Sequence, residues 1–306
     1  MKTPIAQQNK RSFLRGFGGR NLVIGIPFLW LLLFFLVPFL IVVRISVTQL
    51  DESGNPFTDL VTWVDGLLTL KLKFSNYLLL LQDDLYIYTY ASSLKYAAIT
   101  TALCLLIGYP FAYFMARAKP QHRPALLMLV MMPFWTSFLL RIYAWKGILA
   151  NNGLLNHFLI SIGVINEPIH MLHTPFSLVI GMVYAYLPFM ILPLYSNLVK
   201  MDLRFLEAAA DLGATPWVAF WKITVPLSKS GIIAGAMLVF IPCIGEFVIP
   251  ELLGGPETLM IGRVLWDEFF TNNDWPMAAS VTVIVILMIL VPMAIFNKYQ
   301  AEPRQA

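Results

Sequence analysis

Six long apolar segments divide this chain of 306 residues, and they constrain its fold more than any other feature of the sequence. A helix needs about 20 apolar residues to cross the hydrocarbon core of a bilayer. Only 12% of the residues are charged, whereas soluble domains carry about 25%, so the chain has too few charges to cover a globular surface in water. We therefore predict an all-α, multi-pass membrane protein with six transmembrane helices. The expected spans are 22–43, 93–116, 124–140 with a possible extension to Trp145, 176–199, 231–249 and 277–296.

The charged residues are sorted between the two sides of these spans. An even number of spans places both termini on one side. If that side is the cytoplasm, its segments hold 14 of the 21 basic residues and 4 of the 17 acids, a balance of +10 that leaves −6 for the other side. Because short cytoplasmic loops are enriched in Lys and Arg, we predict that both termini are cytoplasmic.

This orientation defines the expected parts of the chain. The first apolar segment is too long for a signal peptide and has no small-residue cleavage site, so we expect an uncleaved anchor. A turn at Gly254-Gly255-Pro256 and a short helix over 259–270 are predicted in the second outer loop, and a short surface helix in the first, which contains the apolar stretch 78–81. The parts are a basic N-terminus 1–21, a transmembrane domain 22–299 and a tail 300–306, with outer loops 44–92 and 250–276 and a cytoplasmic loop 200–230.

The cytoplasmic loop 200–230 predicts two short helices joined by a turn. Asp202 is a suitable N-cap for the first helix, and Gly213 ends it. Thr215 and Pro216 begin the second helix as N-cap and first residue, and residues 225–226 close it. Exposed apolar side chains in such a loop indicate either a protein interface or a helix resting on lipid headgroups. The side chains expected to be exposed are Leu206, Ala208, Ala209, Trp217, Phe220 and Trp221.

The same loop resembles the signature of permease subunits of ATP-binding-cassette importers. That signature is EAA, three residues, G, nine residues and then I-x-L-P, and here Val225 replaces the preferred leucine. The resemblance implies that the loop couples the permease to an ATPase subunit, with Glu207 making polar contacts and Gly213 permitting the bend. The matching residues are Glu207, Ala208, Ala209, Gly213, Ile223 and Pro226.

Three further stretches, 133–156, 183–195 and 240–270, resemble the permeases of polyamine importers, above all those for putrescine. The resemblance implies a type I importer core in the bacterial inner membrane. It also implies a second homologous permease, two cytoplasmic ATPase subunits that use ATP and Mg²⁺, and a periplasmic polyamine-binding protein. Sulfate, iron and molybdate importers share the loop signature, so these cargoes stay open. A stand-alone secondary transporter is the alternative from a different class.

The remaining motifs do not indicate an enzyme. The phosphate-binding pattern G-x-x-x-x-G-K-[ST] is absent from the sequence, and no nucleophile–base pair stands out. His170 and His173 stand three residues apart in an outer loop, which is a poor metal signature. We therefore expect a transport subunit that binds no cofactor, metal or nucleic acid itself.

Transport of a diamine would require carboxylates for its ammonium ends and aromatic faces for the desolvated cation. Glu246 is the one acid clearly inside an expected span, about 22 Å beyond Gly231 along a helix and hence in the outer third of the bilayer. A structural pair with a basic residue is the alternative role for Glu246, and interfacial or packing roles are the alternatives for the aromatics. The candidate path aromatics are Trp135, Tyr143, Trp145, Tyr184 and Tyr186, and the candidate outer-mouth or binding-protein contacts are Glu251, Asp267 and Glu268.

Overall fold

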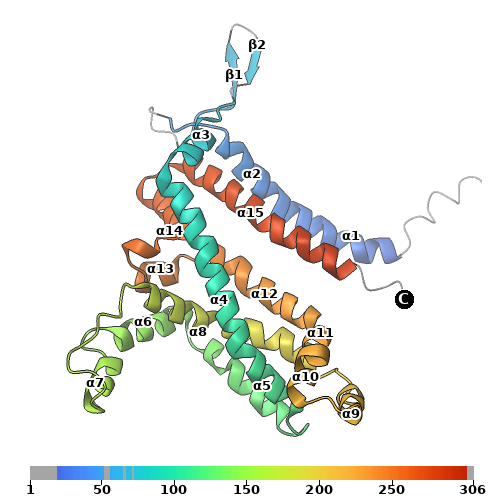
Figure 1. The fold of residues 1–306 in the computed structure, drawn as a ribbon. Coiled ribbons are helices and arrows are strands. Elements are labelled where there is room, and N and C mark those ends of the chain that lie inside the picture. The colour runs from blue at the N-terminus through green and yellow to red at the C-terminus, as the bar shows by residue number, and fades with distance from the viewer. Residues whose placement is uncertain (1–18, 52–55, 65–66, 71, 302–306) are drawn as a thin grey trace, which may run out of the picture. The chain divides into compact units, whose positions relative to one another are not determined.

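The computed structural model describes residues 19–51, 56–64, 67–70 and 72–301 (Figure 1). Most of the expected basic N-terminus 1–21 and of the tail 300–306 lies outside these residues. The chain divides into two compact units, one formed by Met1–Asn76 with Trp275–Val283 and the other by Tyr77–Asp274 with Ile284–Ala306.

Four continuous helices in the described residues are long and apolar enough to cross a membrane. Two bent helix pairs pass the same test, so the expected six spans are found if each pair counts as one span. The continuous spans are Val23–Ser46, Asp84–Arg117, Pro175–Leu198 and Trp275–Ala294, and the bent pairs are Arg123–Trp135 with Phe138–Ser161 and Pro216–Leu227 with Lys229–Ile244.

The third expected span, 124–140, is not a single straight helix, and this prediction is wrong. Its two halves meet at an angle of 86°. Pro133 tightens the end of the first half into a 3₁₀ turn, and the Thr136 backbone then becomes extended. The Thr136 hydroxyl donates to the Pro133 carbonyl at 2.9 Å, which occupies an acceptor that a continuing helix would need. The elements are α5 (Arg123–Met131), η3 (Met132–Trp135), α6 (Phe138–Leu149) and α7 (Leu154–Ser161).

The fifth expected span, 231–249, also differs from the prediction. Helix α12 (Lys229–Ile244) ends before Gly245, and a separate helix α13 (Val248–Leu253) follows. Glu246 therefore lies in the break between two helices and not inside a span helix. Its carboxylate accepts hydrogen bonds from the amides of Val248 and Ile249, which begins the new helix.

The centre of the larger unit is a bundle of α4 (Asp84–Arg117), α8 (Pro175–Leu198) and α12 (Figure 1). Small residues allow close approach at the buried Met190 of α8. A Cβ on Gly235 would lie 2.7 Å from the Met190 sulfur, and one on Gly108 would lie 3.2 Å from its Cγ. Close packing at small residues is the usual way in which membrane helices associate.

The smaller unit contains α1 (Gly19–Leu31), η2 (Leu32–Leu36), α2 (Val37–Ser46) and an antiparallel hairpin of β1 (Val61–Val64) and β2 (Leu67–Leu70). The hairpin pairs Val61 with Leu70, and it was not expected from the sequence. Ser280 of α15 (Trp275–Ala301) donates a hydrogen bond to the Ser46 carbonyl at 2.9 Å, which fixes the start of α15 against the end of α2.

The outer segments begin and end differently from the prediction. The first outer loop contains a short helix, as expected, and this is α3 (Ser75–Gln82). Helix α4 starts nine residues before the expected span, because Asp83 caps it by accepting from the Leu85 amide at 2.8 Å. The expected helix over 259–270 is confirmed as α14 (Ile261–Trp266) and the π-helical turn η6 (Asp267–Thr271), which follow η5 (Pro256–Thr258).

Candidate functional site

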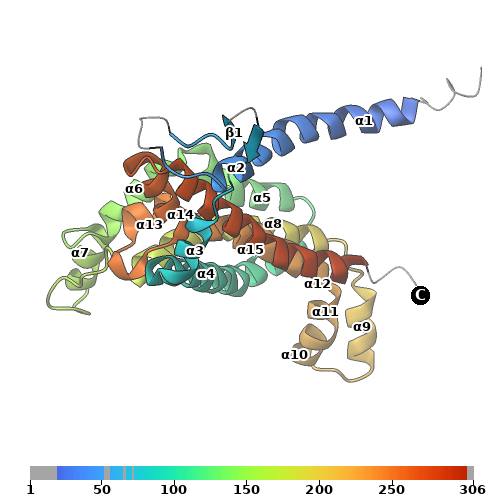
Figure 2. The same cartoon turned by 90° about the horizontal axis from the view of Figure 1, so that it is seen from above.

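The cytoplasmic loop forms the two helices that its caps predict. Helix α9 (Arg204–Asp211) ends at Gly213, whose φ of +81° lies in the left-handed region that glycine favours. Thr215 then accepts a hydrogen bond from the Val218 amide at 3.4 Å and caps α10 (Pro216–Ala219). Figure 2 shows α9 beside α10 and α11.

The two ends of this helical pair differ in detail from the prediction. Leu203 occupies the N-cap position of α9, while the Asp202 carboxylate accepts from the Arg204 amide and pairs with its guanidinium at 2.7 Å. These contacts lower the pKa of the Asp202 carboxyl. The second helix ends at Leu227, one residue after the expected close at residues 225–226. It runs through the π-helical turn η4 (Phe220–Thr224) and α11 (Val225–Leu227), and the chain then bends by 66° into α12.

The apolar surface of this coupling loop is only partly the one expected. Trp217 is 69% exposed, and Trp221 and Ala208 are also exposed. Ala209, however, is buried, and Leu206 and Phe220 are half-buried, so the prediction that these three are exposed is wrong.

Phe220 is withdrawn from solvent because its ring packs between two tyrosines of α4. It contacts Tyr109 and Tyr113 edge-on, with ring centroids 5.5 Å and 6.3 Å apart. A cavity of about 280 Å³ lies beside these rings and is lined mainly by apolar groups of the loop. The signature residue Glu207 stays exposed, and its side chain has no hydrogen-bond or ion-pair partner among the described residues.

Glu246 is held on both carboxylate oxygens by this chain. One oxygen accepts from the amides of Val248 at 3.1 Å and Ile249 at 3.4 Å, and the other accepts from the hydroxyl of Tyr186 on α8. Within the described residues Glu246 forms no ion pair with a basic side chain. The sequence therefore identified the acid, whereas its contacts are with a phenol and a helix N-terminus.

The five candidate path aromatics do not form one cluster. Tyr186 is buried beside Glu246 and has a tilted ring contact with Phe189. Trp145 and Tyr184 form a separate edge-on pair, with centroids 5.5 Å apart. Trp135 is 70% exposed and Tyr143 is also exposed, so these two would need a partner chain or lipid to cover them.

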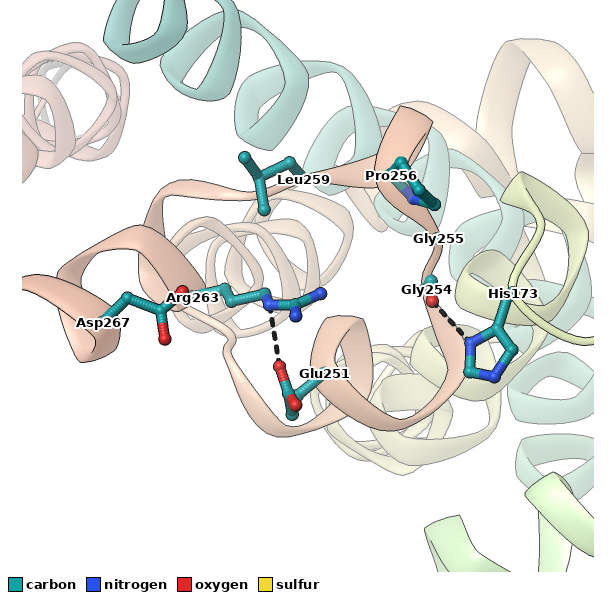
Figure 3. A pocket seen from close by; sticks show the side chains of 8 residues that line it. All are labelled: His173, Glu251, Gly254, Gly255, Pro256, Leu259, Arg263 and Asp267. Carbon is teal, nitrogen blue, oxygen red and sulfur yellow. Dashed lines mark hydrogen bonds and ion pairs between the residues drawn. The ribbon is translucent and has the colours of Figure 1, made fainter. Parts of the chain in front are cut away.

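A cavity of about 500 Å³ lies where the second outer loop meets the segment before α8 (Figure 3). Glu251 of α13 and Arg263 of α14 face each other in it as an ion pair of 2.7 Å. His173 closes another side, where its Nδ1 donates to the Gly254 carbonyl at 2.8 Å. The lining residues are His173, Glu251, Gly254, Gly255, Pro256, Leu259, Arg263 and Asp267.

The three acids expected at the outer mouth separate in the structure. Glu251 and Asp267 line the cavity, whereas Glu268 accepts hydrogen bonds from the Tyr86 hydroxyl at 2.6 Å and the Asn272 amide group at 2.9 Å. Sequence reasoning missed Arg263 and His173. A lone arginine in an otherwise acidic outer loop was the available signal for the first, and the second was considered only as part of a poor metal signature with His170. No group of three metal-ligating side chains is arranged for an ion in the part of the chain that the structure describes.

Comparison with known proteins gives one consistent result. Residues 11–301 match the family described as binding-protein-dependent transport system inner membrane component. The chain is 40% identical over 283 residues to a spermidine/putrescine transport system permease protein PotB of Haemophilus influenzae, a match that covers 92% of this chain and 94% of the relative. It is 42% identical over 266 residues to the PotB protein of Escherichia coli K12, covering 86% and 92% of the two chains.

A solved structure has the same fold at low sequence identity. It is a bacterial alginate ABC transporter in complex with an alginate pentasaccharide-bound periplasmic protein. The TM-score is 0.64 with 17% sequence identity, and the match covers 97% of this chain and 96% of that one. The expected importer-permease fold is therefore confirmed over nearly the whole chain.

Proposed function

This chain belongs to the family of binding-protein-dependent transport system inner membrane components, and we propose that it is the permease subunit of an ATP-driven polyamine importer. It is a multi-pass protein of the inner membrane. We infer the polyamine cargo from the sequence identity of 40–42% with permeases of spermidine/putrescine transport systems, which extends over most of both chains.

The proposed machine has further subunits. A second homologous permease completes the pathway, two cytoplasmic ATPase subunits use ATP and Mg²⁺, and a periplasmic polyamine-binding protein delivers the cargo. The coupling loop supports the ATPase partner because it presents Trp217, Trp221 and the unpaired Glu207 to solvent. Exposed apolar surface of this kind indicates a protein interface.

The charge of the outer segments suits a cationic cargo. The 500 Å³ cavity has two carboxylates and one guanidinium among its lining side chains, and Glu246 lies five residues before its lining residue Glu251, directly after the fifth-span helix α12. A flexible diamine that reaches Glu246 would exchange water for carboxylate and aromatic contacts. We propose Glu246 and Tyr186 as part of the path, with Trp145 and Tyr184 as a second aromatic pair along it.

The test is reconstitution of the four kinds of subunit in liposomes, with uptake of putrescine, spermidine and sulfate measured side by side. We expect uptake of a polyamine that requires hydrolysable ATP and the binding protein, and no uptake of sulfate. Uptake of sulfate would contradict the assignment of a polyamine as the cargo. Polyamine uptake by this chain alone, driven by an ion gradient and indifferent to ATP, would reject the importer and support a secondary transporter.

A further inference from the structure

We propose that α4 connects the coupling loop to the outer cavity, with Phe220 and Tyr86 as positioning residues at its two ends. The inference rests on the proposed coupling to an ATPase. Helix α4 has 34 residues and is therefore about 50 Å long at 1.5 Å per residue, enough to extend past the hydrocarbon core on both sides. Each end makes specific contacts with a different functional segment of the same compact unit.

At the inner end, the coupling loop holds α4 through aromatic rings and one buried hydrogen bond. Phe220 inserts its ring between Tyr109 and Tyr113, and the stacked ring of Trp217 covers it at 6.0 Å. The hydroxyls of Tyr109 and Ser228 lie 2.8 Å apart. Because the rings and the hydrogen bond all join the loop to α4, a displacement of the loop acts directly on the inner end of α4.

At the outer end, α4 holds the segment 256–271 by three hydrogen bonds. The Tyr86 hydroxyl donates to the Glu268 carboxylate at 2.6 Å, and the Tyr88 hydroxyl donates to the Glu257 carbonyl at 2.8 Å. The Ile261 amide donates to the buried hydroxyl of Ser93 at 2.8 Å. This segment carries one wall of the outer cavity, including the lining residues Leu259, Arg263 and Asp267.

The opposite wall of the cavity is fixed to α8 instead. The carbonyl of Leu253, the last residue of α13, accepts from the Ser177 hydroxyl at 2.6 Å and from the His173 amide at 3.1 Å. Glu251 lies on α13, so its ion pair with Arg263 joins a wall held by α8 to a wall held by α4 (Figure 3). A shift of α4 relative to α8 would therefore change the cavity at this pair.

The experiment measures access to the cavity in the complete transporter. Leu259→Cys introduces a thiol at a half-buried lining position, while the native Cys104 and Cys243 are fully buried and serve as a silent background. A membrane-impermeant maleimide is applied from the outside, without nucleotide and with ATP plus vanadate. We expect the labelling rate to change about fivefold with nucleotide when α4 is intact, and the change to vanish in Phe220→Ala although ATP hydrolysis continues.

Further variants separate positioning from general damage. Tyr86→Phe and Tyr109→Phe each remove only a hydroxyl, so they replace Phe220→Ala if that variant does not assemble, and both are expected to reduce the nucleotide response. Phe220→Tyr keeps the ring and should retain the response. Phe158→Ala on α7, an exposed phenylalanine, is the matched control.

Two results overturn the proposal. One is an unchanged nucleotide response in Phe220→Ala, or in both hydroxyl variants if Phe220→Ala does not assemble. The other is a labelling rate of Leu259→Cys that does not change with nucleotide, although α4 and the coupling loop are native and ATP is hydrolysed. ATP-driven polyamine uptake can persist in either case. The labelling experiment therefore tests the role of α4, and only the uptake assay tests the proposed function.

Discussion

The hydroxyl of Tyr186 on α8 donates a hydrogen bond to the carboxylate of Glu246, in the break between α12 and α13. The other carboxylate oxygen accepts from the amides of Val248 and Ile249. One acid thus links α8 to the start of α13, where the partial positive charge of a helix N-terminus favours a carboxylate. Its two possible roles, a structural cap and a charge on the cation path, are separable by substitution.

Glu246→Gln should reduce uptake at equal membrane abundance. The glutamine carbonyl still accepts from the amides that begin α13, and its NH₂ group can donate to the Tyr186 hydroxyl, so the fold keeps its contacts while the charge is lost. Glu246→Ala should in addition lower stability, by about 0.5–2 kcal/mol for the lost cap. Uptake kinetics and thermal unfolding in detergent measure the two effects. Unchanged kinetics in Glu246→Gln would assign this acid to the structural role.

Gly262→Ala should destabilise the outer loop, whereas Gly147→Ala should not. A Cβ on Gly262 would lie 2.5 Å from the Gly245 carbonyl oxygen and 2.6 Å from that of Glu246, and backbone atoms cannot turn aside as a flexible side chain can. Gly147 also lies in a helix, but a Cβ there meets nothing within 4 Å, so alanine should be neutral or stabilising by up to about 1 kcal/mol. Thermal unfolding of the two purified variants checks this, and equal midpoints would contradict the close contact that positions Glu246.

Arg263→Gln should lower the KM for a cationic cargo at low ionic strength. The cavity then keeps the carboxylates of Glu251 and Asp267 without the guanidinium that pairs with one of them. The difference in KM between Arg263→Gln and the native permease should disappear in about 0.5 M salt, because the screening length falls from about 10 Å at 0.1 M towards 3 Å at 1 M. Initial uptake rates at two salt concentrations measure it. A KM that does not respond to this substitution at either salt concentration would place the cavity off the cation's route.

The parts of the fold that the sequence predicted are those determined by local signals. Gly213 and the pair Thr215-Pro216 each specify a backbone conformation from their own chemistry, and the structure has the helix end and helix start where they stand. Hydrophobic length likewise predicted the four continuous spans, since the need for about 20 apolar residues does not depend on neighbours.

The parts that it did not predict depend on contacts between distant residues. The stretch from Ile244 to Ile249 is apolar except for Glu246, so hydropathy continues across the break, and only the capping contacts of Glu246 show where α13 begins. From the sequence alone Phe220 is expected to be an exposed loop residue. Its ring is covered by contact with Tyr109, which lies more than a hundred positions earlier in the chain. The cavity pair Glu251 and Arg263 is similarly a tertiary contact between two short helices.

Glu207→Ala should leave the folded permease unchanged and weaken its hold on the ATPase. The Glu207 side chain is exposed and has no partner among the described residues, and alanine has the highest helix propensity, so α9 loses no hydrogen bond or ion pair within this chain. Asp211→Ala is the matched control, because Asp211 is an exposed acid one turn later on the same helix. The amount of ATPase that co-purifies and the uptake per ATP hydrolysed should fall for Glu207→Ala alone. Equal losses in both variants would contradict a specific role for Glu207.

Gly213→Val should uncouple ATP hydrolysis from uptake, and Gly163→Val supplies a control with the same backbone strain. Both glycines follow the C-cap of a short helix with positive φ, +81° and +73°, and a Cβ at either position meets nothing within 4 Å. The cost of each substitution is therefore the left-handed conformation itself, about 1–2 kcal/mol, and not a clash. The two variants should lose similar thermal stability, while only Gly213→Val, in the coupling loop, should hydrolyse ATP without proportionate uptake. If Gly163→Val lowers uptake per ATP equally, strain anywhere in the chain suffices and the bend at Gly213 has no special part in coupling.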